Sequence, residues 1–167
     1  MLFRSINSRR AADSVDAVFA ANAAAAYIGG IPESRSFVAM LAAFRATGGT
    51  ARGDDLARLL VEHQCGDFVS LARCLAAGKL FCFQWRGCTW IPMFQFELAD
   101  LSIKSSPHRV RDELPARFSG WAQAAWFARK HDSLDGHRPV DMFGSDFSRV
   151  IDAAREETPL ELRMATQ

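Results

Sequence analysis

Residues 54–92 decide the fold of this chain, and they read DDLARLLVEHQCGDFVSLARCLAAGKLFCFQWRGCTWIP. Apolar residues recur every three or four positions over 54–63 and again over 68–77, which predicts two amphipathic helices. Gly66 lies in the break between them. Two short aromatic-rich runs over 80–91 flank an Arg-Gly turn, which predicts an antiparallel β-hairpin.

Two helices joined by a glycine-containing turn and followed by a hairpin have the element order of a winged helix-turn-helix. In that fold the second helix, here residues 67–77 with Asp67 as its cap, enters the major groove of DNA. The candidate DNA contacts are the polar and basic residues of this helix and of the segment after it. They are Ser70, Arg73, Lys79 and Arg86.

The charge of this segment gives DNA binding little support. Residues 51–97 hold five basic side chains and five acidic ones, and the 167-residue chain as a whole has 20 basic and 19 acidic residues. Phosphate contacts dominate affinity for nucleic acid, so a net charge of +1 excludes a grip by the whole chain on DNA or on an anionic membrane. We therefore expect no membrane binding, and DNA binding only through local contacts.

The composition indicates a chain that folds without disulfide bonds or a structural metal ion. Half of the residues are hydrophobic (49%), with 13 Phe and 4 Trp, which suffices for a sizeable core. The four Cys show no CxxC spacing, which is typical of reduced thiols in a cytoplasmic protein. The sequence has no nucleophile elbow, no phosphate-binding glycine loop and no metal-ligand spacing, so we expect neither an enzyme nor a bound metal or cofactor.

The segments around the hairpin divide the chain further. Residues 1–33 form an Ala-rich N-terminal extension, whose uncharged run of sixteen residues (17–32) is too short for a membrane span. Residues 34–98 form the helix-turn-helix-like unit, which starts with a helix over 34–47. We expect the apolar junction at 92–98 to be buried.

The last third of the chain predicts more helices. Residues 118–130 form one that contains Trp126, a Leu-Asp-Gly turn follows at 134–136, and Pro139 suits the first turn of a short helix. Ser145 is the expected cap of a closing helix. We expect Trp126 to pack under the turn and its indole N–H to find an acceptor, since an unpaired buried donor is costly.

These C-terminal residues carry a family resemblance. Trp126-Phe127, the run LDGHRPVD at 134–141, and Phe147 with Val150 resemble the toxin-binding domain of Xre/MbcA/ParS-type antitoxins. The run IPMFQF at 91–96 looks like the junction that precedes this domain in some relatives, and Gly78-Lys79-Leu80 is similar to the step before that junction. The motif residues are Trp126, Leu134, Gly136, Arg138, Pro139 and Asp141.

The resemblance implies a mainly α fold, with the winged unit packed on a helical toxin-binding domain at 99–157 and a C-terminal tail at 158–167. It also implies a partner, a RES-domain toxin that consumes NAD and whose active site the antitoxin blocks. Many members of the family bind their own promoter, and we expect a homo-oligomer. The motif residues themselves are interpreted as scaffold, with the binding surface in the tail or on the 129–138 face.

Three hypotheses follow. The chain is a non-enzymatic antitoxin-like protein that neutralises a RES-type toxin, a winged-helix DNA-binding transcriptional regulator, or an interaction domain without a toxin. A neighbouring gene for a RES-type protein favours the first, and salt-dependent binding of promoter DNA favours the second.

Overall fold

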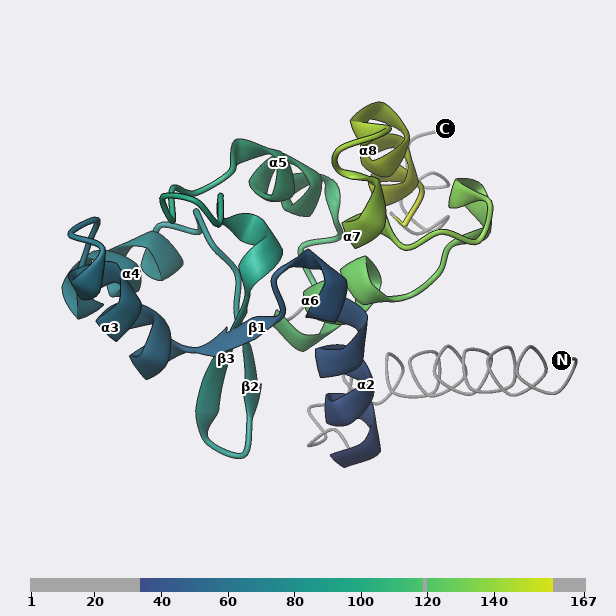
Figure 1. The fold of residues 1–167 in the computed structure, drawn as a ribbon. Coiled ribbons are helices and arrows are strands. Elements are labelled where there is room, and N and C mark those ends of the chain that lie inside the picture. Colours follow the sequence, from purple (N-terminus) through teal and green to yellow (C-terminus); the bar gives the residue numbers. More distant parts are fainter. Residues whose placement is uncertain (1–33, 119, 158–167) are drawn as a thin grey trace, which may run out of the picture.

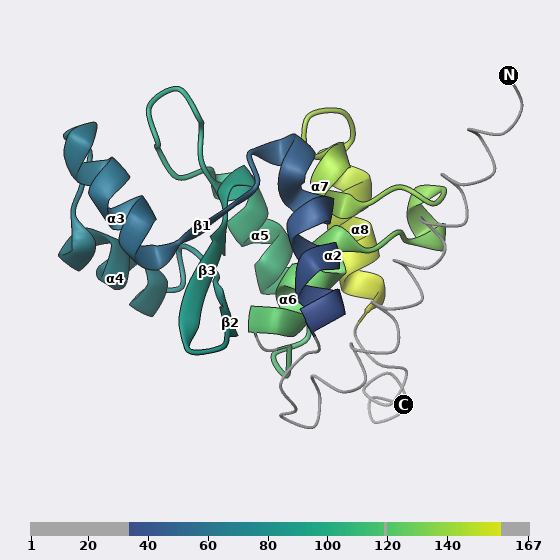
Figure 2. The same cartoon turned by 60° about the horizontal axis from the view of Figure 1, so that its bottom comes forward.

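The computed structural model describes residues 34–118 and 120–157. This part of the chain is mainly helical, with seven α-helices and one three-stranded antiparallel sheet. Figures 1 and 2 show how these elements are arranged. The mainly α class expected from the sequence is confirmed. None of the described helices has the length and apolar character that a membrane crossing needs.

Helices open and close the described part of the chain, and the three strands lie in its first half. In chain order the elements are α2 (Ser34–Phe44), β1 (Thr50–Arg52), α3 (Gly53–Glu62), α4 (Phe68–Ala76), β2 (Phe83–Trp85), β3 (Cys88–Pro92), α5 (Ser105–Glu113), α6 (Gly120–Ala128), α7 (Pro139–Met142) and α8 (Phe147–Glu156). Short 3₁₀ turns lie at Arg45–Thr47, Met93–Gln95 and Asp132–Leu134.

Helix α4 begins and ends where the sequence predicts. The Asp67 side chain accepts from the backbone N–H of Ser70, and the Ser70 hydroxyl accepts from the N–H of Asp67, so the two form a capping box. These hydrogen bonds lower the pKa of Asp67. At the other end, Gly78 takes a left-handed φ of 66°, which suits the residue that follows a helix.

The sheet has one strand more than predicted. The hairpin of β2 and β3 is present, and Arg86 and Gly87 both take positive φ in its turn, as tight hairpin turns require. Strand β1 pairs with the other edge of β3, giving the order β1-β3-β2. Because β1 and β2 pair with its two sides, β3 is the central strand of the sheet. Pro92 is its last residue.

Several predicted boundaries were wrong. The first strand of the hairpin, β2, starts at Phe83 instead of residue 80. Helix α2 ends at Phe44, and the chain continues as a 3₁₀ turn to Thr47. The cap of α8 is Asp146 and not Ser145, because the Asp146 carboxylate accepts from the N–H of Arg149.

The described residues form two hydrophobic cores. Helices α3 and α4 lie on one side of the sheet and α2 and α6 on the other, as both views show. Phe83, Trp85 and Trp90 lie on the face toward α2 and α6, and belong to or border the larger core. Ile91 points to the opposite face and joins the smaller core, which contains Leu56 and other residues of α3 and α4. Helix α2 thus packs with the C-terminal helices and not with α3 and α4.

The apolar junction after β3 is buried as predicted, over most of its length. Residues 92–96 are buried, whereas Glu97 and Leu98 are exposed. Phe94 packs against Phe44 and Phe127, so the junction joins α2 to α6.

Candidate partner-binding site

The motif turn lies over Trp126. Trp126 is 1% exposed in α6, and Leu134 and Val140 from the turn are buried in the same core. The burial that the sequence predicts for these three side chains is therefore confirmed.

The tip of the turn is built from two residues in the left-handed region. Asp135 has a φ of 54° and Gly136 a φ of 75°, and the backbone N–H of His131 donates to the carbonyl of His137 at 3.1 Å across the turn. A Cβ at Gly136 meets nothing within 4 Å. Gly136 is thus present for its backbone conformation and not for close packing.

Arg138 ties the turn to the start of the described chain. Its Nη1 donates to the carbonyl of Ala43 at 3.2 Å, and its Nε lies 3.4 Å from a carboxylate oxygen of Asp141. Ala43 belongs to the last turn of α2, whose carbonyls lack partners within the helix. Pro139 occupies the first turn of α7. Arg138, Pro139 and Asp141 therefore hold the scaffold together.

The expected acceptor for the indole of Trp126 is not there. The Nε1 atom is buried and has no hydrogen-bond partner in the described part of the chain, so this prediction was wrong. The turn uses its own carbonyls internally: the oxygen of His131 accepts from Leu134 and Gly136, and that of Leu134 accepts from His137. The imidazole of His131 also lies against the ring, with the two ring centroids 4.8 Å apart.

His131 is the buried titratable group of this site. Its Nε2 lies 2.9 Å from the carbonyl oxygen of Trp126, and its Nδ1 lies 3.7 Å from the carboxylate of Glu157. Because a carbonyl only accepts, Nε2 carries the proton, and the nearby Nε of Arg129 at 3.3 Å is then not its hydrogen-bond donor. Burial lowers the pKa of His131, the Trp126 hydrogen bond opposes this, and the Arg129 charge adds to it.

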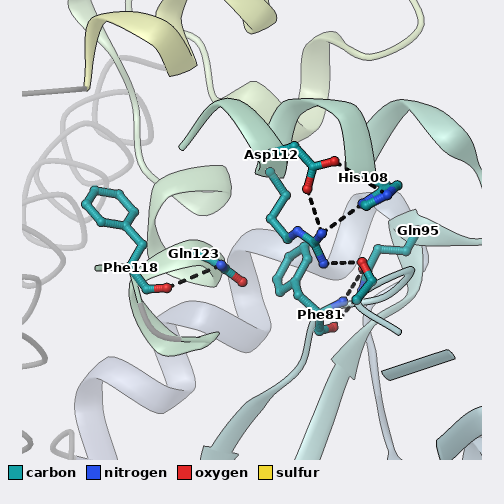
Figure 3. A network of polar contacts seen from close by, with 8 residues as sticks. Phe81, Gln95, His108, Asp112, Phe118 and Gln123 are labelled. Atoms are coloured by element: carbon teal, nitrogen blue, oxygen red, sulfur yellow. Dashed lines mark hydrogen bonds and ion pairs between the residues drawn. The ribbon is translucent and has the colours of Figure 1, made fainter. Parts of the chain in front are cut away.

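The junction contains a buried polar clamp that the sequence did not reveal. Gln95 is 2% exposed, and its amide accepts from the N–H of Phe81 at 2.9 Å and donates to the Phe81 carbonyl at 3.0 Å, as drawn in Figure 3. It also donates to the carbonyl of Pro92 at 3.1 Å. The side chain thus pairs with the segment before β2 as a neighbouring strand would.

A second polar network joins α5 to the end of α4. The guanidinium of Arg111 donates to the carbonyl of Gly78, lies 2.9 Å from Nδ1 of His108 and bonds to the carboxylate of Asp112 at 2.6 Å. Figure 3 shows that His108 and Asp112, both on α5, also contact each other, with Nε2 of His108 3.4 Å from an Asp112 carboxylate oxygen. The Gly78 step and the Gln95 junction therefore both hold elements together.

The structure does not bring the four candidate DNA contacts together as one polar face. The Ser70 hydroxyl is used in the capping box, and Ser70 lines a cavity with Cys74 on one side of α4. Arg86 donates to the Ser34 hydroxyl at 3.1 Å and lies over the ring of Trp85. Arg73 and Lys79 are exposed.

The exposed side of α4 is mostly apolar. At about 100° per residue, the exposed positions follow one another around the helix as an arc. In that order they are Phe68, Ala72, Ala76, Val69 and Arg73. The single charged residue thus lies at one border of the arc, and a helix that reads base edges usually presents several polar side chains.

No arrangement for metal or thiol chemistry stands out in residues 34–118 and 120–157. No group of three or more His, Cys, Asp or Glu residues there is placed to hold a metal ion. The four cysteines are free, and burial raises the pKa of the Cys82 thiol, which disfavours its nucleophilic thiolate.

Comparison with known proteins completes the description of the site. No protein-family model, no curated protein and no solved structure matches this chain significantly.

Proposed function

We propose that the chain is a non-enzymatic, antitoxin-like protein that binds and neutralises a RES-domain toxin. The observation that supports this most is the way in which the residues of the resemblance fold as one unit. Trp126 and Leu134 are buried under the turn, and Arg138 ties that turn to α2. These residues therefore act as a scaffold, which is the role that we interpret for them from the sequence.

The scaffold leaves a charged surface beside it for the toxin. Arg129 forms an ion pair with Glu157. Lys130, Asp132 and Asp135 are exposed along the 129–138 face. The tail at 158–167 lies outside the described residues, and it follows directly after Glu157. Glu157, after which the tail begins, therefore lies beside the 129–138 face through its bond with Arg129.

The test is co-expression with the product of the neighbouring gene, which the proposal expects to be a RES-type protein. We expect the tagged chain to retain that protein on an affinity column and to restore growth of cells in which it is toxic. A chain lacking residues 158–167 tests the tail, and Lys130→Glu with Asp132→Arg tests the face. If both variants still neutralise, the binding surface lies elsewhere, and if the wild-type chain fails to retain the toxin, the proposal is wrong.

A winged-helix regulator is the second candidate function. The order α2-β1-α3-α4-β2-β3, with the strand order β1-β3-β2, favours it, because winged helices arrange their elements in this way. The apolar arc of α4 and the packing of α2 on the far face of the sheet speak against it. A chain with neither activity is best described as an interaction domain.

Promoter binding tests this alternative directly. If the chain is a DNA-binding regulator, we expect Arg73→Ala to weaken binding to DNA from its own upstream region and to reduce the salt slope by about one phosphate contact. Arg155→Ala is the matched control, because Arg155 lies on α8 and pairs with Glu113. Equal affinities for the two variants would exclude α4 as the reading helix.

A further inference from the structure

The surface of α3 and α4 carries an apolar cluster without a partner. Among the described residues, six large hydrophobic side chains are exposed, and Val61, Phe68 and Val69 lie within nine positions of one another. They are 56%, 62% and 51% exposed. Clustered exposure of this kind marks an interaction surface, whereas single exposed apolar residues do not. We call Val61, Phe68 and Val69, with the surface between them, the α3–α4 face.

The shape of the α3–α4 face combines a projection with hollows. Phe68 lines a hollow of about 440 Å³ together with Val61, Arg58 and Glu62 of α3. It also lines a second hollow of about 270 Å³ between α4 and the β-hairpin. An exposed aromatic ring therefore stands between two depressions of its own surface.

We propose that the α3–α4 face pairs with the same face of a second copy of this chain, across a two-fold axis. A two-fold interface uses the same patch on both copies, so that patch must contain both the projecting group and the place that receives it. The α3–α4 face meets this requirement, because Phe68 of one copy has an apolar hollow to enter on the other.

The charges on α3 are complementary under the same symmetry. Arg58 and Glu62 lie four residues apart on the wall of the larger hollow. The two copies of α3 then run antiparallel, and the two-fold axis crosses them at the level of residue 60. In this arrangement Arg58 of each copy lies opposite Glu62 of the other. Arg58 already pairs with Asp55 at 2.5 Å, but this pair is exposed to solvent, so Arg58 exchanges it at little cost.

A second copy fits this face better than DNA does. Arg58 and Arg73 are the cations of α3 and α4, and Asp54, Asp55, Glu62 and the cap Asp67 outnumber them. Phosphate groups are repelled by such a surface, whereas a two-fold partner supplies an apolar ring and pairs Arg58 and Glu62 with opposite charges. In the dimer the exposed arc of α4 is covered and cannot enter the major groove.

The test measures the mass of the full chain in solution by light scattering and sedimentation. We expect a dimer for the wild type and at least a tenfold weaker self-association for Phe68→Asp and for the milder Phe68→Ser. Val38→Asp is the matched control, because Val38 is 62% exposed and lies on α2, on the far side of the sheet. Unchanged far-UV circular dichroism establishes that each variant is folded.

A charge exchange tests the antiparallel arrangement. Arg58→Glu and Glu62→Arg each place like charges opposite one another, so each alone is expected to weaken the dimer, and the double variant to restore it. A monomeric wild type at tens of micromolar, or a dimer that survives Phe68→Asp, overturns the proposal. If a monomeric wild type dimerises only after removal of residues 1–33, the N-terminal segment of the chain is the occupant instead.

Discussion

Trp126 combines a large buried ring with an unpaired indole N–H, and these two properties have opposite effects on stability. We expect Trp126→Ala to lower the free energy of unfolding by about 3–5 kcal/mol, because it leaves a cavity under the motif turn. Trp126→Phe retains most of the ring and removes the unpaired donor, so we expect it to cost far less. Urea unfolding followed by circular dichroism measures both, and equal losses would show that Nε1 has a partner after all.

His131 makes stability depend on pH. Its pKa in the folded chain lies below the ordinary value of 6.5, chiefly through burial, so between these two values the unfolded chain binds more protons. The contribution of His131 to the free energy of unfolding is therefore constant above about pH 6.5. It decreases as the pH falls toward the folded pKa, by at most about 1.4 kcal/mol per pH unit.

Urea midpoints at a series of pH values from 7.5 downward check this prediction. His131→Gln should remove the part of the slope that His131 contributes. A wild-type slope that persists in His131→Gln would assign the pH dependence to another group.

Burial was easier to predict than polar contacts at this scale. Trp126 and Leu134 were predicted to be inside because large apolar residues leave water. Gln95, by contrast, stands in an aromatic run, and only the fold shows that Phe81 lies within reach of its amide. The partners of Arg138 and Arg86 were hidden for the same reason, since Ala43 and Ser34 are far away in sequence.

At the scale of elements, strong local signals gave correct predictions and weak ones did not. Helix α4 combines periodic leucines with a capping box and a terminal glycine, all of which are visible in the sequence. Helix α5 was missed because it is polar and buries only Pro107 and Val110, so it has no apolar stripe. Strand β1 was missed because three residues are too few to show alternation.

The start of α6 depends on a glycine. A Cβ at Gly120 would lie 1.9 Å from the carbonyl oxygen of Cys82, so α6 touches the backbone just before β2. We expect Gly120→Ala to destabilise the chain by about 3 kcal/mol, because backbone on both sides must move. Gly136→Ala should cost only about 1 kcal/mol, since it meets open space and only its positive φ is unfavourable.

Thermal and urea unfolding of the two variants tests this difference. Because both replace glycine by alanine, they change the entropy of the unfolded chain equally, and the comparison isolates the folded state. A Gly120→Ala variant as stable as Gly136→Ala would mean that α6 can shift away from β2 without loss.

At the scale of the whole molecule, the two cores share one thin sheet and should unfold together. All four tryptophans of the chain belong to or border the larger core, whereas Leu56 is fully buried in the smaller one. We expect Leu56→Ala to lower stability by about 2–5 kcal/mol. Tryptophan fluorescence should report the same shifted midpoint as far-UV circular dichroism, because the sheet couples the cores. A fluorescence midpoint equal to that of the wild type would show that α3 and α4 unfold independently.

The division into two cores could not be predicted from the sequence. Helix α2 was expected to join the helices that follow it directly, yet Phe44 stacks on Phe94 and α2 packs on α6. Pairing between such distant segments depends on the path of the chain around the sheet, which no local periodicity records.

The placement of α2 also has a consequence for synthesis on the ribosome. Residues of the smaller core lie between 56 and 101 and emerge as one continuous stretch, so that core can close early. The apolar side of α2 emerges first, yet Ala124, Phe127 and Val150, which complete its core, leave the exit tunnel last. At elongation rates of about 5–20 residues per second, Phe37, Met40 and Phe44 wait several seconds for these partners. During that interval the apolar side of α2 is exposed to water, which makes the nascent chain a substrate for chaperones.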